Sequence, residues 1–331
     1  MRWKTLTVSL IVSAASATLY PPHPATALDR ATMPSNRTLN PAEISAHAQW
    51  VIYLNIDNTM AMPDAGALLA RYLNTHPKVK KTIRQADVII GNRFPDDFHD
   101  VVITGNNAGP GQGQGVVLIH AIASQDHIDK MLSLNPANTT ITVDNRIIHI
   151  IPGKHDQTTF EVSPMPGTFV VSRSEKSLVD ELKVLRGQAP AMTTHGSLLA
   201  GAGRGTIFYL ADTALAESAK PHGPHQGSVW LAHVRSAWLA AHRKDGTLQL
   251  VGRIEAKTAT AAAEMARAAR GIQSMLELTG TSATANPHQR FLAAVVRGLK
   301  VRAAGTTVRL HLAMTLRTLL TGLRRNARAG Q

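Results

Sequence analysis

Two histidines, His222 and His225, lie close together in the segment KPHGPHQG (220–227). Imidazole nitrogens are common zinc ligands, but a structural zinc needs four ligands and a catalytic zinc needs three with one open position. His233 and His242 follow in the chain, yet there is no His-Glu-x-x-His motif to set ligand geometry. We therefore predict an exposed loop and no cofactor, with zinc binding by His222 and His225 as the alternative.

Carboxylates gather in the segment FPDDFHD (94–100), where Asp96, Asp97 and Asp100 surround His99. Such a group could bind a cation or support acid–base catalysis. The segment also contains a proline, and aspartate is common in turns because its side chain bonds to nearby backbone. We therefore predict a polar turn.

Nucleophilic catalysis has little support in the sequence. The chain contains no cysteine, which excludes thiolate catalysis, thiolate metal sites and disulfides. It has no Gly-x-Ser-x-Gly motif, and no Ser-x-x-Lys occurs around Ser172, Ser174 or Ser177. Three histidines in apolar segments, His120, His149 and His311, are predicted to bond to backbone partners or to lie on an exposed sheet face.

The segment GNNAGPGQGQG (105–115) is rich enough in glycine to suggest a phosphate-binding loop. Such a loop needs a helix N-terminus directly after it, and the Walker form adds Gly-Lys-Ser/Thr. Here the β-rich run VVLIHAIA follows, and no lysine accompanies the glycines. The pattern predicts a long hairpin connection between two strands.

The charge distribution is the feature that points to a partner. The chain has 35 Lys and Arg against 22 Asp and Glu, and no acidic residue follows Glu277. A basic block attracts anionic surfaces. The predicted contact residues are Arg309, Arg317, Arg324, Arg325 and Arg328, and the predicted partners are anionic envelope polysaccharide or lipid headgroups, with no nucleic acid expected.

The N-terminus has the pattern of a secretory signal. MRWK is a basic start, an apolar run follows, and Ala25-Thr26-Ala27 is a small-x-small cleavage site. The run is too short to span a membrane, and the mature chain is predicted to have no transmembrane segment. We expect an exported protein, either periplasmic or extracellular.

The remaining sequence predicts alternating short strands and helices in two halves. The expected parts are a signal peptide (1–27), a flexible arm (28–46), a first unit (47–187), a linker (188–204) and a second unit (205–331). WVIYLNID (50–57) and TIFYLAD (206–212) would begin the halves. The predicted fold class is α+β, with two similar units, each a mainly antiparallel sheet with helices packed on one face.

The same order of elements resembles a known group of proteins. DVVITG, a loop, GVVLIHAIA and a helix are followed by GTFVVSRSEKSLVDELKVLRG and a closing RFLAAVVRGLKVRAAGTTVRLHLAMTLRTLL. This rhythm resembles that of exported tandem α+β proteins of planctomycete-type bacteria. The resemblance implies a fold and an exported location, and it supplies no catalytic residues.

The sequence thus predicts an exported, non-catalytic protein that binds a partner or has a structural role in the cell envelope. A basic C-terminal face is the candidate contact surface. One alternative is a hydrolase or metal-dependent enzyme whose site is assembled between the two units. A second is metal binding by the histidine-rich loop.

Overall fold

A computed structural model of the chain describes residues 37–62, 65–91, 93–106, 115–153, 157–193, 197–203, 205–213, 231–244, 247–282 and 284–315. The chain divides between residues 196 and 197 into two compact units. Both contain antiparallel sheets with helices, so the predicted α+β class is confirmed. The predicted signal peptide, the centre of the glycine-rich loop, the histidine-rich loop and the last predicted helix lie outside the described residues.

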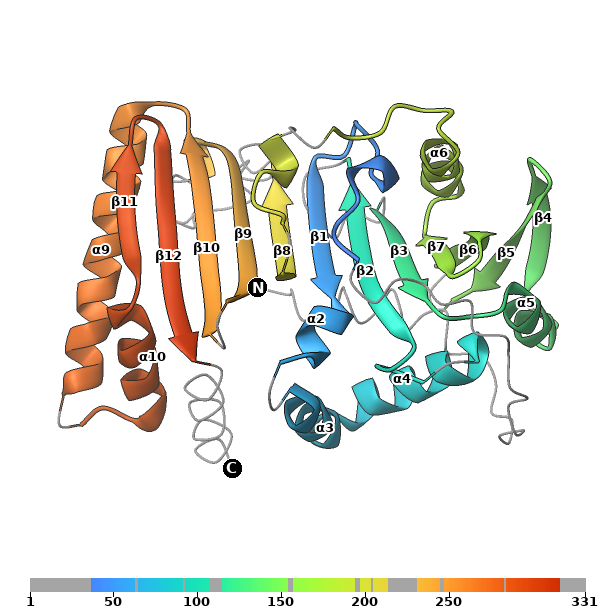
Figure 1. The fold of residues 1–331 in the computed structure, drawn as a ribbon, viewed down its shortest axis with the longest axis horizontal. Helices are drawn as coiled ribbons and strands as arrows, with labels where there is room; N and C mark the ends of the chain where they lie inside the picture. The colour runs from blue at the N-terminus through green and yellow to red at the C-terminus, as the bar shows by residue number, and fades with distance from the viewer. Residues whose placement is uncertain are drawn as a thin grey trace. The chain divides into compact units, whose positions relative to one another are not determined.

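The first unit is built on an antiparallel sheet with the strand order β1-β2-β3-β7-β6-β5-β4 (Figure 1). Its strands are β1 (Trp50–Asn55), β2 (Phe98–Gly105), β3 (Gly115–Ala121), β4 (Thr139–Val143), β5 (Arg146–Pro152), β6 (Thr158–Met165) and β7 (Thr168–Ser172). Its helices are the short 3-10 helix η2 (Pro41–Glu43), α2 (Ile56–Met60), α3 (Ala65–Thr75), α4 (Pro77–Ile90), α5 (Gln125–Ser133) and α6 (Glu175–Leu185).

Two hairpins in this unit follow directly from local sequence. β2 and β3 pair antiparallel up to Gly105 opposite Gly115, which confirms that the glycine-rich segment joins two strands. Asp144 and Asn145 connect β4 to β5 with φ angles of 49° and 62°. These left-handed conformations suit a two-residue hairpin turn and are tolerated by Asp and Asn.

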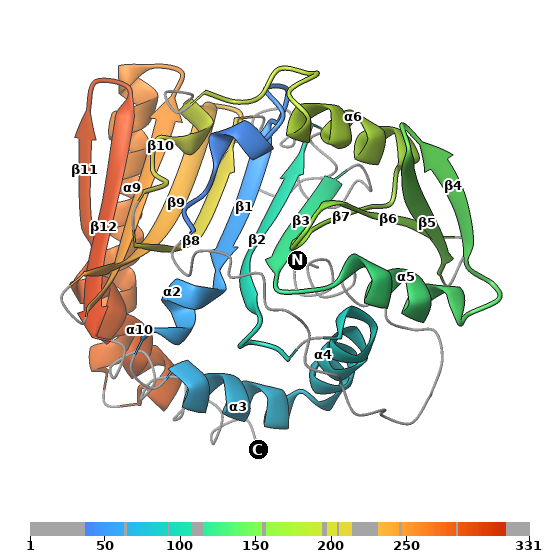
Figure 2. The same cartoon turned by 45° about the vertical axis from the view of Figure 1, so that its right-hand side comes forward.

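Helices cover both faces of the first sheet, whereas the prediction placed them on one. Side chains alternate between the two faces of a strand, so Val117 and Ile119 of β3 face one way and Val116 the other. Val117 and Ile119 share a core cluster with Ile128 and Leu132 of α5. α6 contacts β3, β6 and β7, and it lines a pocket with Val116, which places it on the opposite face. In Figure 2, α6 lies toward the top of the view and α5 toward the bottom.

The second unit has the strand order β8-β9-β10-β12-β11. Its elements are the 3-10 helix η3 (Ser197–Leu199), β8 (Thr206–Asp212), β9 (Val234–Lys244), β10 (Thr247–Ala256), α9 (Ala259–Thr281), α10 (Pro287–Arg297), β11 (Lys300–Ala304) and β12 (Thr307–Thr315). In both units the first three strands are adjacent in chain order, and the last strand of the unit pairs with the third.

Small residues let α9 pack closely on one face of the second sheet. Ala261, Ala262, Met265 and Ala266 form a buried cluster with Val308 and with other apolar strand side chains. α10 contacts α9 far more extensively than it contacts the strands. Both helices therefore leave the opposite face of β10, β12 and β11 without helical cover from the described part of this unit.

The helix signals in the sequence mark the observed boundaries well. Ser124, Ser174 and Thr258 each accept a backbone N–H bond at a helix N-terminus, as expected for capping residues. α3 ends at Thr75 and α4 begins at Pro77, because the residue before a proline avoids the helical conformation. The sequence analysis did not identify α10, although Asn286 and Gln289 form a capping box at its start.

Candidate functional site

A row of three arginines crosses the uncovered face of the second sheet. Arg302 of β11 lies directly opposite Arg309 of β12, and Arg309 lies directly opposite Arg253 of β10. Residues in register on adjacent strands point to the same face, and strands are about 4.8 Å apart. We call these three residues the arginine row, which spans roughly 10 Å of the sheet.

The arginine row is accessible and lies opposite the helices. Val308 and Leu310, the sequence neighbours of Arg309, point into the cluster beneath α9, so Arg309 points away from it. Arg302 and Arg309 are exposed and Arg253 is half-buried. Of the predicted contact residues, Arg309 therefore lies on an exposed basic face, while Arg317, Arg324, Arg325 and Arg328 lie outside the described residues.

Acidic residues are scarce around this row. β9, β11 and β12 contain no Asp or Glu, and β10 contains only Glu255. Glu255 forms an ion pair with Arg253 and accepts a hydrogen bond from Thr307 at 2.9 Å. Burial acts to raise the pKa of Glu255, but the bonds from Thr307 and Arg253 outweigh it and lower this pKa. The single carboxylate is thus ionised and already bound.

The row continues toward an aromatic side chain. Trp238 of β9 lies opposite Arg253, and its ring centroid is 6.2 Å from that of Tyr209 on β8. The Tyr209 hydroxyl donates to the Leu198 carbonyl of η3 at 2.6 Å. η3 thus covers the β8 end of this face, while the β10-β12-β11 end carries the arginines.

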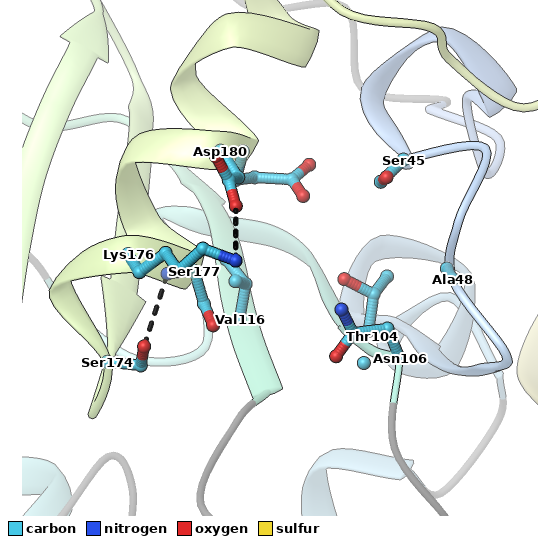
Figure 3. A pocket seen from close by; sticks show the side chains of 11 residues that line it. Ser45, Ala48, Thr104, Asn106, Val116, Ser174, Lys176, Ser177 and Asp180 are labelled. Atoms are coloured by element: carbon cyan, nitrogen blue, oxygen red, sulfur yellow. Dashed lines mark hydrogen bonds and ion pairs between the residues drawn. The ribbon is translucent and has the colours of Figure 1, made fainter.

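A separate pocket of about 220 Å³ lies on the first unit beside α6 (Figure 3). Ser174, Lys176, Ser177 and Asp180 of α6 and its N-cap form one wall of this pocket. The rest of the lining comes from three segments. Ser45 and Ala48 follow η2, Thr104, Gly105 and Asn106 lie at the end of β2, and Val116 lies at the start of β3. Glu181 also lines this pocket, which we call the α6 pocket.

Glu181 is the unusual residue of the α6 pocket. Its side chain is buried, with the residue only 3% exposed, and its Oε1 has no hydrogen-bond partner among the described residues. Burial, and then the nearby charge of Glu43, raise the pKa of Glu181 to about 8. An unsatisfied buried carboxyl is uncommon in proteins and marks a candidate binding position.

A buried polar network fixes the segment around Arg37 on the same sheet face. The Nδ1 atom of His120 lies 2.5 Å from Asp100 Oδ1, and its Nε2 lies 3.4 Å from Glu43 Oε2. The guanidinium group of Arg37 lies 2.8 Å from Glu43 Oε1, through Nη2, and 3.2 Å from Asp100 Oδ2, through Nε. Asn55 donates to the Arg37 carbonyl at 2.7 Å.

This network is closed, because both ring nitrogens of His120 already face charged side chains and His120 is only 1% exposed. These contacts tie η2 and the segment around Arg37 to β2 and β3. The partners of His120 are side chains, whereas the sequence analysis expected backbone partners. Residues 37–46 belong to the predicted arm, and here Ile44 is fully buried against the unit.

The other candidate residues of the first unit do not form one site. Asp97 accepts the Arg93 backbone N–H at 2.8 Å, which confirms a turn role for this aspartate. His99 lies 3.0 Å from Asp57, and Asp100 belongs to the buried network. The acidic segment is therefore split between three sets of partners.

The histidines outside this segment are also separated from one another. His149 Nε2 lies 2.8 Å from Asp129, and His311 is half-buried on the face of the arginine row. His233 is exposed, while burial lowers the pKa of His242. His222 and His225 lie outside the described residues. Within the described part of the chain, no group of three or more His, Asp or Glu side chains is arranged to hold a metal ion.

Sequence reasoning found Arg309 but missed the other members of the arginine row and the α6 pocket. Arg253 and Arg302 lie on different strands, and only the register of β10, β12 and β11 shows that they flank Arg309. Glu181 sits in a helix with ordinary amphipathic spacing. Its burial depends on where α6 docks, so the local sequence carries no sign of it.

These features place the chain in the class of α+β proteins with antiparallel sheets, and its second unit has an exposed basic sheet face. No family model matches the sequence, and no curated protein matches it. Solved structures that resemble the chain include crystal form III of TP0453, with a TM-score of 0.46 and 8% identity over 86% of this chain and 98% of that chain. For crystal form I of TP0453 the TM-score is 0.44 and the identity is 10%, over 87% of this chain and 97% of that chain. Among the described residues, no helix is both long and apolar enough to span a membrane.

Proposed function

We propose that this chain is an exported, non-catalytic binding protein of the cell envelope. It contacts anionic groups of a polysaccharide or of lipid headgroups through the arginine row. The exported location follows from the N-terminal signal pattern, and the excess of basic residues supplies the long-range attraction.

The single observation that supports this function is the register of Arg302, Arg309 and Arg253. Like charges directly opposite each other destabilise a sheet. Glu255 already offsets the charge of Arg253, whereas Arg302 and Arg309 face each other directly, and a bound anion would offset the repulsion between them. The guanidinium group binds phosphate, sulfate and carboxylate in a two-pronged geometry. The row therefore suits a partner that presents several anionic groups side by side.

The test is binding of the full chain to vesicles and to a soluble polyanion. Vesicles that contain phosphatidylglycerol, vesicles of phosphatidylcholine alone, and an anionic polysaccharide such as polygalacturonate separate the lipid from the polymer. Each basic side chain near an anionic surface contributes about 1 kcal/mol, so the Arg302→Gln/Arg309→Gln variant should bind about 30-fold more weakly. Raising the salt from about 0.1 M to about 1 M should abolish binding, because screening shortens from about 10 Å to about 3 Å.

A matched control removes the same charge from the other side of the same unit. Arg267 and Arg270 are exposed on α9, which packs on the opposite face of the sheet. The Arg267→Gln/Arg270→Gln variant should therefore weaken binding less than threefold. Equal losses in the two variants would mean that net charge alone attracts the partner, and the arginine row would then have no special role.

A further inference from the structure

The α6 pocket offers a second binding site that does not depend on the arginine row. Its lining is dominated by small polar groups, including the hydroxyls of Ser45, Thr104 and Ser177. Its volume of about 220 Å³ is below the roughly 300 to 1,000 Å³ of pockets that hold drug-sized ligands. A ligand that fits it must be small and able to form hydrogen bonds.

The charges around the pocket are balanced except at Glu181. Asp180 lies 3.8 Å from Lys176 Nζ (Figure 3). It also lies 3.6 Å from Lys183 Nζ on the exposed side of α6. On η2, Glu43 is committed to Arg37 and His120. The ends of β2 and β3 contribute Thr104, Gly105, Asn106 and Val116, which carry no charge.

Glu181 is therefore a buried carboxyl group, and the charge of another acid, Glu43, acts against its ionisation. A buried carboxylate without a partner is costly, and a positive group brought close to it removes that cost. We propose that the α6 pocket binds a small hydroxylated amine, whose ammonium group pairs with the Glu181 carboxylate and whose hydroxyls bond to Ser45, Thr104 and Ser177.

Other ligand classes fit the lining less well. An anion would meet the buried acid Glu181, and Lys176, the cation in the wall, is already paired with Asp180. A divalent cation needs several carboxylate or carbonyl oxygens, and among the described residues no metal-binding group of side chains is present. A neutral sugar could bond only to the protonated Glu181 carboxyl group and would gain no charge pair from it.

The proton on Glu181 gives the proposal a distinct signature. The pKa of this carboxyl group is raised to about 8 by burial and by Glu43, so Glu181 is mostly protonated at pH 6 to 7 before a ligand binds. An ammonium ligand must expel this proton to form the pair. Its affinity should rise about tenfold from pH 6 to pH 7, with release of about one proton, whereas binding of a neutral ligand should not rise.

The experiment is titration calorimetry of the full chain with glucosamine, ethanolamine and glucose at pH 6 and pH 7. We expect at least one amine to bind with this pH dependence and glucose not to bind. The Glu181→Gln variant should lose at least tenfold in amine affinity and lose the pH dependence. Ala48→Leu, which fills the pocket and leaves Glu181 unchanged, should also lose at least tenfold.

Glu175→Gln is the matched control, because Glu175 is exposed on the same helix and does not line the pocket. It should bind the amine within twofold of the unmodified chain, and thermal unfolding of each variant confirms that it is folded. Absence of binding by both amines, equal binding of glucose and glucosamine, or unchanged amine affinity in Glu181→Gln would each overturn the proposal. None of these results bears on the arginine row.

Discussion

Glu161 shows how a single buried acid makes the stability of the first unit depend on pH. It is buried on β6, and neither carboxyl oxygen has a hydrogen-bond partner among the described residues. Burial, and then the charge of Asp129, raise its pKa from 4.5 to about 8. The folded chain therefore holds this proton more tightly than the unfolded chain does.

The sign of the effect follows from that difference. The stabilisation is complete below pH 4.5 and is lost as the pH rises through about 8. Each pH unit in this window lowers the free energy of unfolding by roughly 1.4 kcal/mol. Glu161→Gln removes this loss, so it should raise the free energy of unfolding at pH 8 by on the order of 3 kcal/mol. Its effect at pH 5 should be small. Urea unfolding at the two pH values measures both, and equal effects at pH 5 and pH 8 would show that Glu161 is ionised in the folded chain.

At the scale of elements, two glycines of α9 serve different purposes. A Cβ atom at Gly280 would lie 2.1 Å from the Ala293 Cβ of α10 and 2.7 Å from the Gln289 carbonyl oxygen. A Cβ atom at Gly271 would meet nothing within 4 Å. Gly280 is therefore needed for close approach of the two helices, and Gly271 is not.

Alanine substitutions separate these two roles. Gly271→Ala should stabilise the chain by up to about 1 kcal/mol, because glycine is the weaker helix former. Gly280→Ala should destabilise it by about 1 to 3 kcal/mol, because the added methyl forces α9 and α10 apart. Urea unfolding of the two variants compares them directly. A gain in stability from Gly280→Ala would mean that the helices are not in close contact there.

The same scale explains how much of the fold could be predicted from the sequence. Hairpins such as that at Asp144 and Asn145, and caps such as Ser174, depend on residues adjacent in the chain, so the local sequence is enough to predict them. The register that aligns Arg253 with Arg309 depends on β12 returning beside β10 after α9 and α10. No local pattern encodes that return, so only one arginine of the row was identified.

The sheet face on which each helix packs could not be predicted for a similar reason. The caps and apolar spacing of α5 and α6 are visible in the sequence, but those patterns do not say which sheet face a helix covers. The prediction of one covered face was therefore wrong for the first unit. The α6 pocket and the burial of Glu181 both result from this docking, and neither could be predicted without it.

At the scale of the whole molecule, the proposed anion binding combines two effects of charge. The chain carries a formal net charge of +13, which attracts any polyanion over a distance set by the ionic strength. The arginine row instead acts only at contact. Long-range attraction mainly changes the rate of association, and the loss of close contacts mainly changes the rate of dissociation.

These two effects can be separated by binding kinetics on an anionic lipid surface. The Arg267→Gln/Arg270→Gln control should slow association slightly and leave dissociation unchanged, because these residues lie on the face opposite the row. The Arg302→Gln/Arg309→Gln variant should slow association to the same small extent, because it removes the same charge, but should speed dissociation by at least tenfold. Surface plasmon resonance at two ionic strengths measures both rates. If both variants changed only the association rate, the row would contribute no contact, and attraction by net charge would account for the binding.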